Sequence, residues 1–165
     1  MRLISIMGFA LLAASPLAAH PGSAHTPAAQ AKIAHDQDQA AVQSVLQQYK
    51  AAIERLDARG TERFFATDSV IFETGGVEGN YANYLAHHLA PELAEFKSFR
   101  FSNYKIEVRF IGPVALATES YAYRIETKKG EVAERLGVAT SVLSKIGGAW
   151  KIISIHNSAR RPKAS

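Results

Sequence analysis

The segment from Glu73 to Glu92, ETGGVEGNYANYLAHHLAPE, concentrates more side chains able to titrate or to bind a metal ion than any other part of the chain. It carries carboxylates at Glu73, Glu78 and Glu92 and adjacent histidines at His87 and His88. Carboxylates and imidazoles act as general acids and bases, and they also bind zinc and copper. The segment therefore predicts either a site that handles a small molecule or a metal site.

Helical geometry separates the two histidines. Asn80 is a typical N-cap, and the residues after it have the spacing of a helix. His88 and Glu92 lie four residues apart and share one face, whereas His87 points about 100° away. A regular helix cannot aim both imidazoles at one ion, so no metal is favoured. A nitrogen–oxygen site made by one of the histidines with Glu73 or Glu78 and His156 stays open as an alternative. So does a metal site that uses Glu78, His87, His88 and Glu92.

His88 has two further interpretations. It is either a core histidine bonded to Glu92 or to a backbone carbonyl, or a pocket residue beside Glu73 and a tyrosine. A carboxylate in an apolar pocket has a raised pKa and can work as a general acid or base. The candidate catalytic residues are therefore Glu73, His88 and Glu119.

Glu119 lies on the apolar face of a predicted strand, in alternation with Tyr121 and Tyr123. A buried charge is costly unless it is paired, so Glu119 either faces a ligand or pairs with an arginine across the sheet. The possible partners are Arg109, Arg124 and Arg135.

His156 alternates with Trp150 and Ile152 in a strand that is apolar on both faces, which predicts a buried position. It is either a hydrogen-bonded core residue or part of the site. The candidate ligand-binding residues are Tyr81, Tyr84, His88, Tyr121, Tyr123 and His156.

The residues before this segment are predicted to form a helix that packs against the rest of the domain. Apolar residues recur at steps of three and four between residues 42 and 56, which indicates one buried helical face. The stripe consists of Val42, Val45, Leu46, Tyr49, Ile53 and Leu56. Asp36 or Asp38 is the expected N-cap, and Gly60 is expected just beyond the C-terminus. Thr61 is expected to begin a short second helix, and Pro91 to kink or restart a third.

Strands dominate the rest of the chain. The alternation of apolar and charged residues over 104–110 breaks between Phe101 and Tyr104, which predicts a bulge. Further strands are expected at residues 69–73, 114–127, 131–145 and 149–157, with glycine-containing turns between the later ones. Helices followed by hairpin-linked strands predict an α+β domain with a curved, mostly antiparallel sheet.

Two stretches resemble a known family. The segments FFATDSVIF (residues 64–72) and WKIISIHNS (residues 150–158), together with the order of elements, resemble the nuclear-transport-factor-2-like superfamily, in particular its SnoaL-like and ketosteroid-isomerase-like branch. The resemblance covers about residues 38–158. It implies a cone of N-terminal helices packed in the sheet, a pocket at the wide end and a homodimer formed through the sheet. Members include isomerases, cyclases, dehydratases and binding modules, and the Tyr-plus-two-Asp set of the isomerases has no counterpart here.

The N-terminus predicts export. A positive residue, an apolar run of about a dozen residues and small residues thereafter have the layout of a signal peptide over residues 1–24, cleaved after Ala19 or Ala24. We expect a flexible leader over 25–36, one domain over 37–158 and a basic tail over 159–165. The location is then periplasmic or secreted, with no membrane attachment after cleavage.

Composition narrows the partners. The chain has no cysteine and a formal charge of +4, much of it in the last residues, and it lacks the interleaved basic and aromatic stripe of nucleic-acid binders. No cofactor and no nucleic acid are expected. The sequence favours a protein that binds a small organic ligand. An isomerase, cyclase or lyase using acid–base Glu and His, and a periplasmic metal binder, are the alternatives.

Overall fold

The computed structural model describes residues 26–163, so the predicted signal peptide and both cleavage positions lie outside the described part. The described residues form three α-helices, one 3₁₀ helix, one π-helical turn and six strands. Their bounds are α1 Pro27–Glu54, a 3₁₀ helix Thr61–Phe64, β1 Phe65–Glu73, β2 Gly76–Gly79, α2 Tyr81–Tyr84, a π-helical turn Leu85–Leu89, α3 Ala90–Glu95, β3 Phe96–Ile111, β4 Val114–Thr127, β5 Val132–Ile146 and β6 Ala149–Arg160. No helix within residues 26–163 is long and apolar enough to cross a bilayer.

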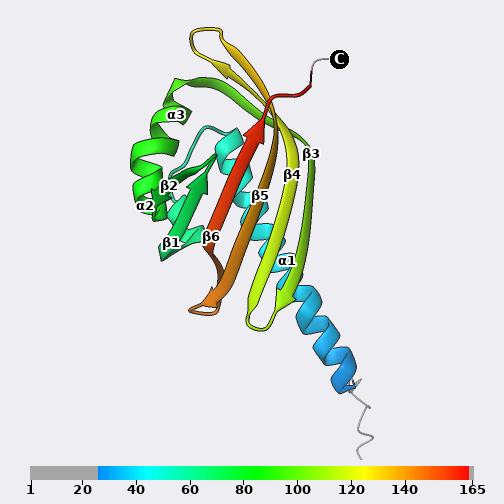
Figure 1. The fold of residues 1–165 in the computed structure, drawn as a ribbon. Helices are drawn as coiled ribbons and strands as arrows, with labels where there is room; N and C mark the ends of the chain where they lie inside the picture. Colours follow the sequence, from blue (N-terminus) through cyan, green and yellow to red (C-terminus); the bar gives the residue numbers. More distant parts are fainter. Residues whose placement is uncertain (1–25, 164–165) are drawn as a thin grey trace, which may run out of the picture.

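The strands form one curved sheet in the order β2-β1-β6-β5-β4-β3. All neighbours are antiparallel except β1 and β6, which run parallel. Figure 1 shows α1 crossing the concave side of this sheet, with α2 and α3 beside its end. The predicted α+β cone is confirmed.

Helix α1 begins earlier than predicted. Thr26 is the N-cap, its hydroxyl accepts a backbone N–H, and Pro27 occupies the first turn. Proline is pre-organised for this position, and the alanine-rich residues that follow favour helix. Residues 27–36 are therefore helical rather than a flexible leader, and neither Asp36 nor Asp38 is the N-cap. These first turns are largely exposed and extend beyond the sheet (Figure 1).

The C-terminus of α1 also differs from the prediction. Leu56, with φ of 55°, takes the left-handed position that was expected further on at Gly60. The Leu56 N–H bonds to the Ile53 carbonyl, and the Asp57 N–H bonds to the Ala52 carbonyl, which is a Schellman motif. Leucine is tolerated there because its side chain packs against the core.

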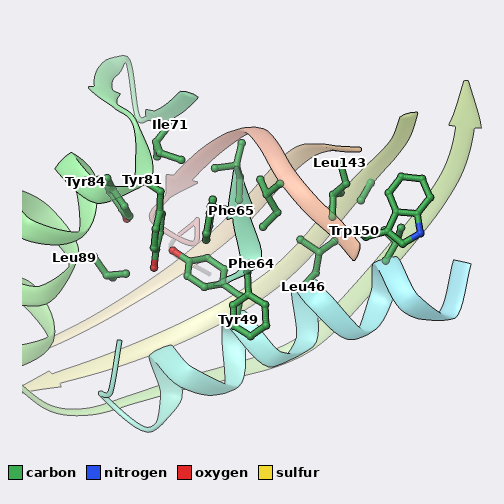
Figure 2. Close-up of a cluster of buried hydrophobic side chains, with 14 of the residues drawn as sticks. Leu46, Tyr49, Phe64, Phe65, Ile71, Tyr81, Tyr84, Leu89, Leu143 and Trp150 are labelled. Atoms are coloured by element: carbon green, nitrogen blue, oxygen red, sulfur yellow. The ribbon is translucent and has the colours of Figure 1, made fainter. Parts of the chain in front are cut away.

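The core lies between α1 and the concave face of the sheet. Figure 2 shows it spread along α1, with Trp150 and Leu143 at one end and Tyr84 and Leu89 at the other. Trp150 is buried, as expected of a core residue, and its Nε1–H bonds to Asp38 on α1 at 3.1 Å. This packing holds α1 in a fixed position against the strands that carry the site.

One bulge in β3 and one in β6 determine which side chains of these two strands face inward. The predicted bulge in β3 is confirmed: the register with β4 shifts between Ser102 and Lys105, and Asn103 has φ of 53°. A second bulge, which the alternation did not reveal, lies in β6 between Ile152 and Ser154. It reverses the face of every later residue in that strand.

The helix after Asn80 continues past Pro91. Asn80 caps it as predicted, accepting the Asn83 N–H at 2.9 Å. Pro91 lacks an N–H and removes one regular helical bond. The chain accommodates this with the wide turn before Pro91, in which the Ala90 N–H bonds to the Leu85 carbonyl. The expected disturbance is therefore a π-helical turn that keeps the axis continuous.

Candidate functional site

A cavity of ≈ 130 Å³ lies between α1, the helical segment 81–95 and the inner faces of β3, β4 and β6. Aromatic rings supply most of its wall: Tyr84, Phe96, Phe99, Phe101, Tyr121 and Tyr123. Phe99 stacks on Tyr123 with centroids 5.2 Å apart, and Phe101 meets Tyr121 edge-on at 5.2 Å. Interlocked rings of this kind make a rigid wall with few rotatable bonds.

The inner end of the cavity is an ion pair. Glu119 is only 4% exposed, and its Oε2 accepts the Tyr104 hydroxyl at 2.5 Å. Lys50 reaches the same oxygen from α1, with Nζ 3.4 Å away. The predicted arginine partners are therefore not the ones that pair with Glu119. Burial lowers the pKa of Lys50, although the Glu119 carboxylate opposes this, and burial together with Glu119 raises the pKa of Tyr104.

A glycine makes room for the Tyr121 ring. Gly137 on β5 pairs with Tyr121 on β4, and a Cβ at this position would overlap the ring. The same ring contacts Lys50, whose Nζ lies 3.8 Å from the ring centroid. Cation–π contact of this kind stabilises a desolvated ammonium.

The outer end of the cavity is carboxylate-rich. Glu73, the last residue of β1, accepts the Tyr84 hydroxyl at 2.7 Å, and burial with the Glu73 charge raises the Tyr84 pKa. Glu92 on α3 lines the same end. The Glu73 and Glu92 side chains are 30% and 53% exposed, against 2% for Glu119, so this end faces solvent.

His88 lies just behind this outer end, among three carboxylates. Its Nδ1 is 3.3 Å from Glu78, and its Nε2 is 3.4 Å from Glu92 and 3.9 Å from Glu73. Desolvation raises the pKa of Glu92, and the nearby Glu73 and Glu78 charges act in the same direction while His88 opposes them. The His88 imidazole is therefore within hydrogen-bonding distance of Glu78 and within ion-pairing distance of Glu73 and Glu92.

The two histidines point apart, as helical geometry predicted. His87 is exposed, while His88 is turned toward the carboxylates. Among residues 26–163, no group of three or more His, Cys, Asp or Glu side chains has an arrangement that would hold a metal ion. The set of Glu78, His87, His88 and Glu92 is thus not assembled around one point.

Three of the predicted ligand-binding residues do not line the cavity: His88, which lies behind its outer end, Tyr81 and His156. Tyr81 is 2% exposed, stacks on Phe65 at 3.6 Å and donates to the Thr61 hydroxyl, so it belongs to the core. His156 is exposed on the outer face of the sheet, beside Phe72, rather than buried. The bulge in β6 explains the difference, because it turns Ile155 inward and His156 outward.

Sequence reasoning brought together Glu73, Tyr84, Glu119, Tyr121 and Tyr123, all of which line the cavity. It missed Lys50, Tyr104 and Asn157. Lys50 follows Leu46 by four residues and precedes Ile53 by three, so a cation within the apolar stripe was the available signal. Asn157 faces inward only because of the β6 bulge, for which the sequence offered no signal.

Comparison with solved structures shows the same fold. A dehydratase candidate of the NTF2-like family from Streptomyces avermitilis superposes with a TM-score of 0.67 at 20% identity, over 77% of this chain and 99% of that one. A ketosteroid isomerase candidate from Shewanella frigidimarina gives 0.61 at 27% identity, over 70% and 92%. A scytalone dehydratase candidate from Novosphingobium aromaticivorans gives 0.68 at 14% identity, over 76% and 86%.

No curated protein sequence matches this chain at a significant level. The model of the SnoaL-like domain, in contrast, matches residues 42–162, which span the inner part of α1, the whole sheet and every residue of the cavity. The chain belongs to the SnoaL-like domain family.

Proposed function

We propose that the protein binds a small organic ligand in the cavity between α1 and the sheet. The observation that carries this proposal is the combination of a ring-lined space with polar groups at both ends, Lys50 and Glu119 inside and Glu73 outside. Ligand sites are typically apolar hollows with a few convergent polar groups. An apolar cavity of about 150 Å³ admits a benzene ring, so ≈ 130 Å³ is close to the space that a single aromatic ring requires.

A screen of single-ring compounds by ligand-observed NMR tests this proposal. Ala159 faces the cavity from β6, so Ala159→Phe fills the space, while Arg161→Phe places the same side chain at an exposed position as a control. Compounds are expected to bind the wild type and the control. Binding should be lost in Ala159→Phe, although the circular dichroism spectrum of this variant should be unchanged. Binding that survives the filling variant would place the ligand elsewhere and refute the proposal.

A second candidate function is acid–base catalysis on the bound ligand. It is favoured by Glu73, which lines the cavity, holds the Tyr84 proton donor at 2.7 Å and has His88 within 3.9 Å. A carboxylate so placed can remove a proton from carbon, and the imidazole can relay it. Isomerases and dehydratases both use such a step.

Solvent exchange tests the catalytic candidate without knowledge of the natural substrate. In D₂O, an enzyme of this kind would exchange the methyl protons of a bound aryl ketone faster than buffer does. We expect Glu73→Gln and His88→Ala to abolish the excess rate while the fold is kept. Full activity in both variants would remove Glu73 and His88 from the mechanism.

We further propose that the protein is exported, on the strength of the signal-like composition of residues 1–24. Expression with those residues should deliver the chain to the periplasm or medium, with a new N-terminus at His20 or His25. Retention of the full-length chain in the cytoplasm would contradict export.

We also propose that two copies associate through the outer face of the sheet. Apolar side chains lie exposed there on β5 and β1, including Val138 (56%), Leu136 (38%) and Val70 (38%). The neighbouring outward residues Thr118, Thr140 and Ser158 are small and uncharged. These apolar and small residues can pack against their own copy, with the charged outward residues of β3, such as Glu107 opposite Thr118, at the margin of the contact.

A further inference from the structure

Lys50 is the only residue lining the cavity, among residues 26–163, that carries a full positive charge. Its side chain is 13% exposed, and it crosses from α1 to the inner face of the sheet. Its Nζ lies 3.8 Å from the Tyr121 ring centroid, 4.6 Å from Phe101 and 5.2 Å from Tyr104. These ring faces stabilise the charge of the ammonium without offering it a hydrogen-bond acceptor as strong as an oxygen.

The hydrogen-bonding capacity of Lys50 is not used up by the protein. An ammonium has three N–H donors. Within the described residues its polar partner is Glu119, at 3.4 Å, which is longer than the roughly 2.7–2.9 Å of charge-assisted hydrogen bonds. The same Oε2 atom already accepts the Tyr104 hydroxyl at 2.5 Å. Donors therefore remain for an acceptor that enters the cavity.

The charges that line the cavity restrict that acceptor to a neutral group. Glu73, Glu92 and Glu119 outnumber Lys50, so an anionic ligand would add a further negative charge to a low-dielectric site. A cationic ligand would leave the Lys50 donors unpaired and repel the ammonium. A neutral molecule with a carbonyl oxygen satisfies Lys50 without either cost.

We propose that Lys50 determines the specificity of the cavity by donating a hydrogen bond to the carbonyl oxygen of a neutral aromatic ligand. This inference rests on the proposed function, because it assumes that the cavity is the ligand site. It assigns the polar end of the ligand to Lys50 and its ring to the wall formed by Tyr121, Phe101 and Phe99.

Four probes of nearly equal shape separate the possible ligand classes. Acetophenone carries the neutral acceptor, α-methylstyrene replaces its C=O with C=CH₂, benzoate is the anion and benzamidine the cation. Dissociation constants are measured by NMR titration at pH 7 on the wild type. A hydrogen bond from a charged donor predicts that acetophenone binds about 10- to 100-fold tighter than α-methylstyrene. Acetophenone is also expected to bind tighter than benzoate and benzamidine.

Lys50→Met keeps the length of the side chain but removes its donors, and Lys97→Met on an exposed part of β3 is the control. We expect the preference for acetophenone over α-methylstyrene to vanish in Lys50→Met and to persist in Lys97→Met. If Lys50→Met does not fold, Glu119→Gln provides an independent test. It keeps the ammonium and removes its counter-charge, so the preference should persist and benzoate should gain affinity.

Several outcomes would overturn the inference while leaving the cavity as the ligand site. These are equal binding of acetophenone and α-methylstyrene, tightest binding of benzamidine, a preference that survives Lys50→Met, and a preference abolished by Glu119→Gln. Failure of all four probes to bind would instead refute the proposed function, and this inference with it.

Discussion

At the scale of single residues, the site depends on a glycine at position 137, which has no side chain to displace the Tyr121 ring. Gly137 lets the Tyr121 ring lie against β5, and Tyr121 in turn covers the Lys50 ammonium. Glu119 and Tyr104 complete the polar end of the cavity from β4 and β3. The geometry of Lys50 is thus set by contacts from β3 and β4, and indirectly by β5 through Gly137.

Gly137→Ala should displace the Tyr121 ring, because the new methyl group would occupy its place. Overpacking of this kind costs roughly 1–3 kcal/mol of unfolding free energy. Urea denaturation of Gly137→Ala, Tyr121→Ala and the double variant measures it. We expect the cost of Gly137→Ala to fall sharply when Tyr121 is already alanine. Equal costs in both backgrounds would show that the ring is not what excludes a side chain at Gly137.

Residue-level prediction from the sequence succeeded where a residue's own strand decided its direction. Glu119, Tyr121 and Tyr123 follow the alternation of β4, and all three line the cavity. The partner of Glu119 could not be predicted in this way, because Lys50 reaches it from a helix that is distant in the sequence. Pairing across the fold depends on tertiary packing, which periodicity does not encode.

At the scale of elements, one carboxylate ties α1 to the end of the sheet. Asp38 Oδ1 accepts the Trp150 Nε1–H at 3.1 Å and pairs with the Lys145 ammonium at 2.6 Å. Lys145 and then Trp150 lower the pKa of Asp38 below 3.8. Because Lys50 is part of α1, this contact also helps to fix the position of the Lys50 ammonium relative to the cavity.

The pH dependence of Asp38→Asn follows from that lowered pKa. A carboxyl group whose pKa is depressed in the folded state stabilises the fold above its unfolded pKa, and the contribution is lost as pH falls through the folded value. The melting temperature of Asp38→Asn should lie below that of the wild type at pH 7. The difference should shrink as pH falls below 3.8.

Asp36→Asn is the control, since the ion-pair partners of Asp36 are Lys32 and His35, both on the exposed first turns of α1. Its effect at pH 7 should be smaller, as expected of a solvent-exposed i,i+4 pair. A difference for Asp38→Asn that stays constant from pH 7 to pH 3 would contradict the assigned role of the carboxylate.

The boundary of an element could be predicted where local sequence signals marked it. Strand β4 was predicted over residues 114–127 and is observed at Val114–Thr127, because alternation and flanking turns agree. The extra residue in β6 has no such signal, and it moved His156 to the outer face. In the same way, the start of α1 was misplaced because Thr26-Pro27 lay within a stretch whose composition suggested a loop.

At the scale of the whole molecule, the two faces of the sheet differ in what they contact. Its concave face encloses the core and the cavity, while its outer face exposes the apolar residues proposed to join two copies. The order of elements was enough to predict an α+β domain with a curved sheet, and the cone was predicted from the family resemblance. The cavity was predictable only through the family resemblance, because its walls come from segments far apart in the sequence.

Val138→Lys tests the proposed association. Val138 and Ile111 are equally exposed, at 56%, but Val138 lies in the middle of the outer face and Ile111 at the hairpin end of β3. Light scattering should report a dimer for the wild type and for Ile111→Lys, and a monomer for Val138→Lys. A wild type that is monomeric at micromolar concentration would refute association through this face.

The central claim is that the cavity beside Lys50 holds a neutral aromatic ligand, and a crystal structure of the protein soaked with acetophenone tests it most directly. We predict electron density for the ring between Tyr121, Phe101 and Phe99, with the carbonyl oxygen within hydrogen-bonding distance of the Lys50 Nζ. Density for the ligand only on the outer face of the sheet, or in the cavity with its oxygen turned away from Lys50 toward Glu73, would contradict it.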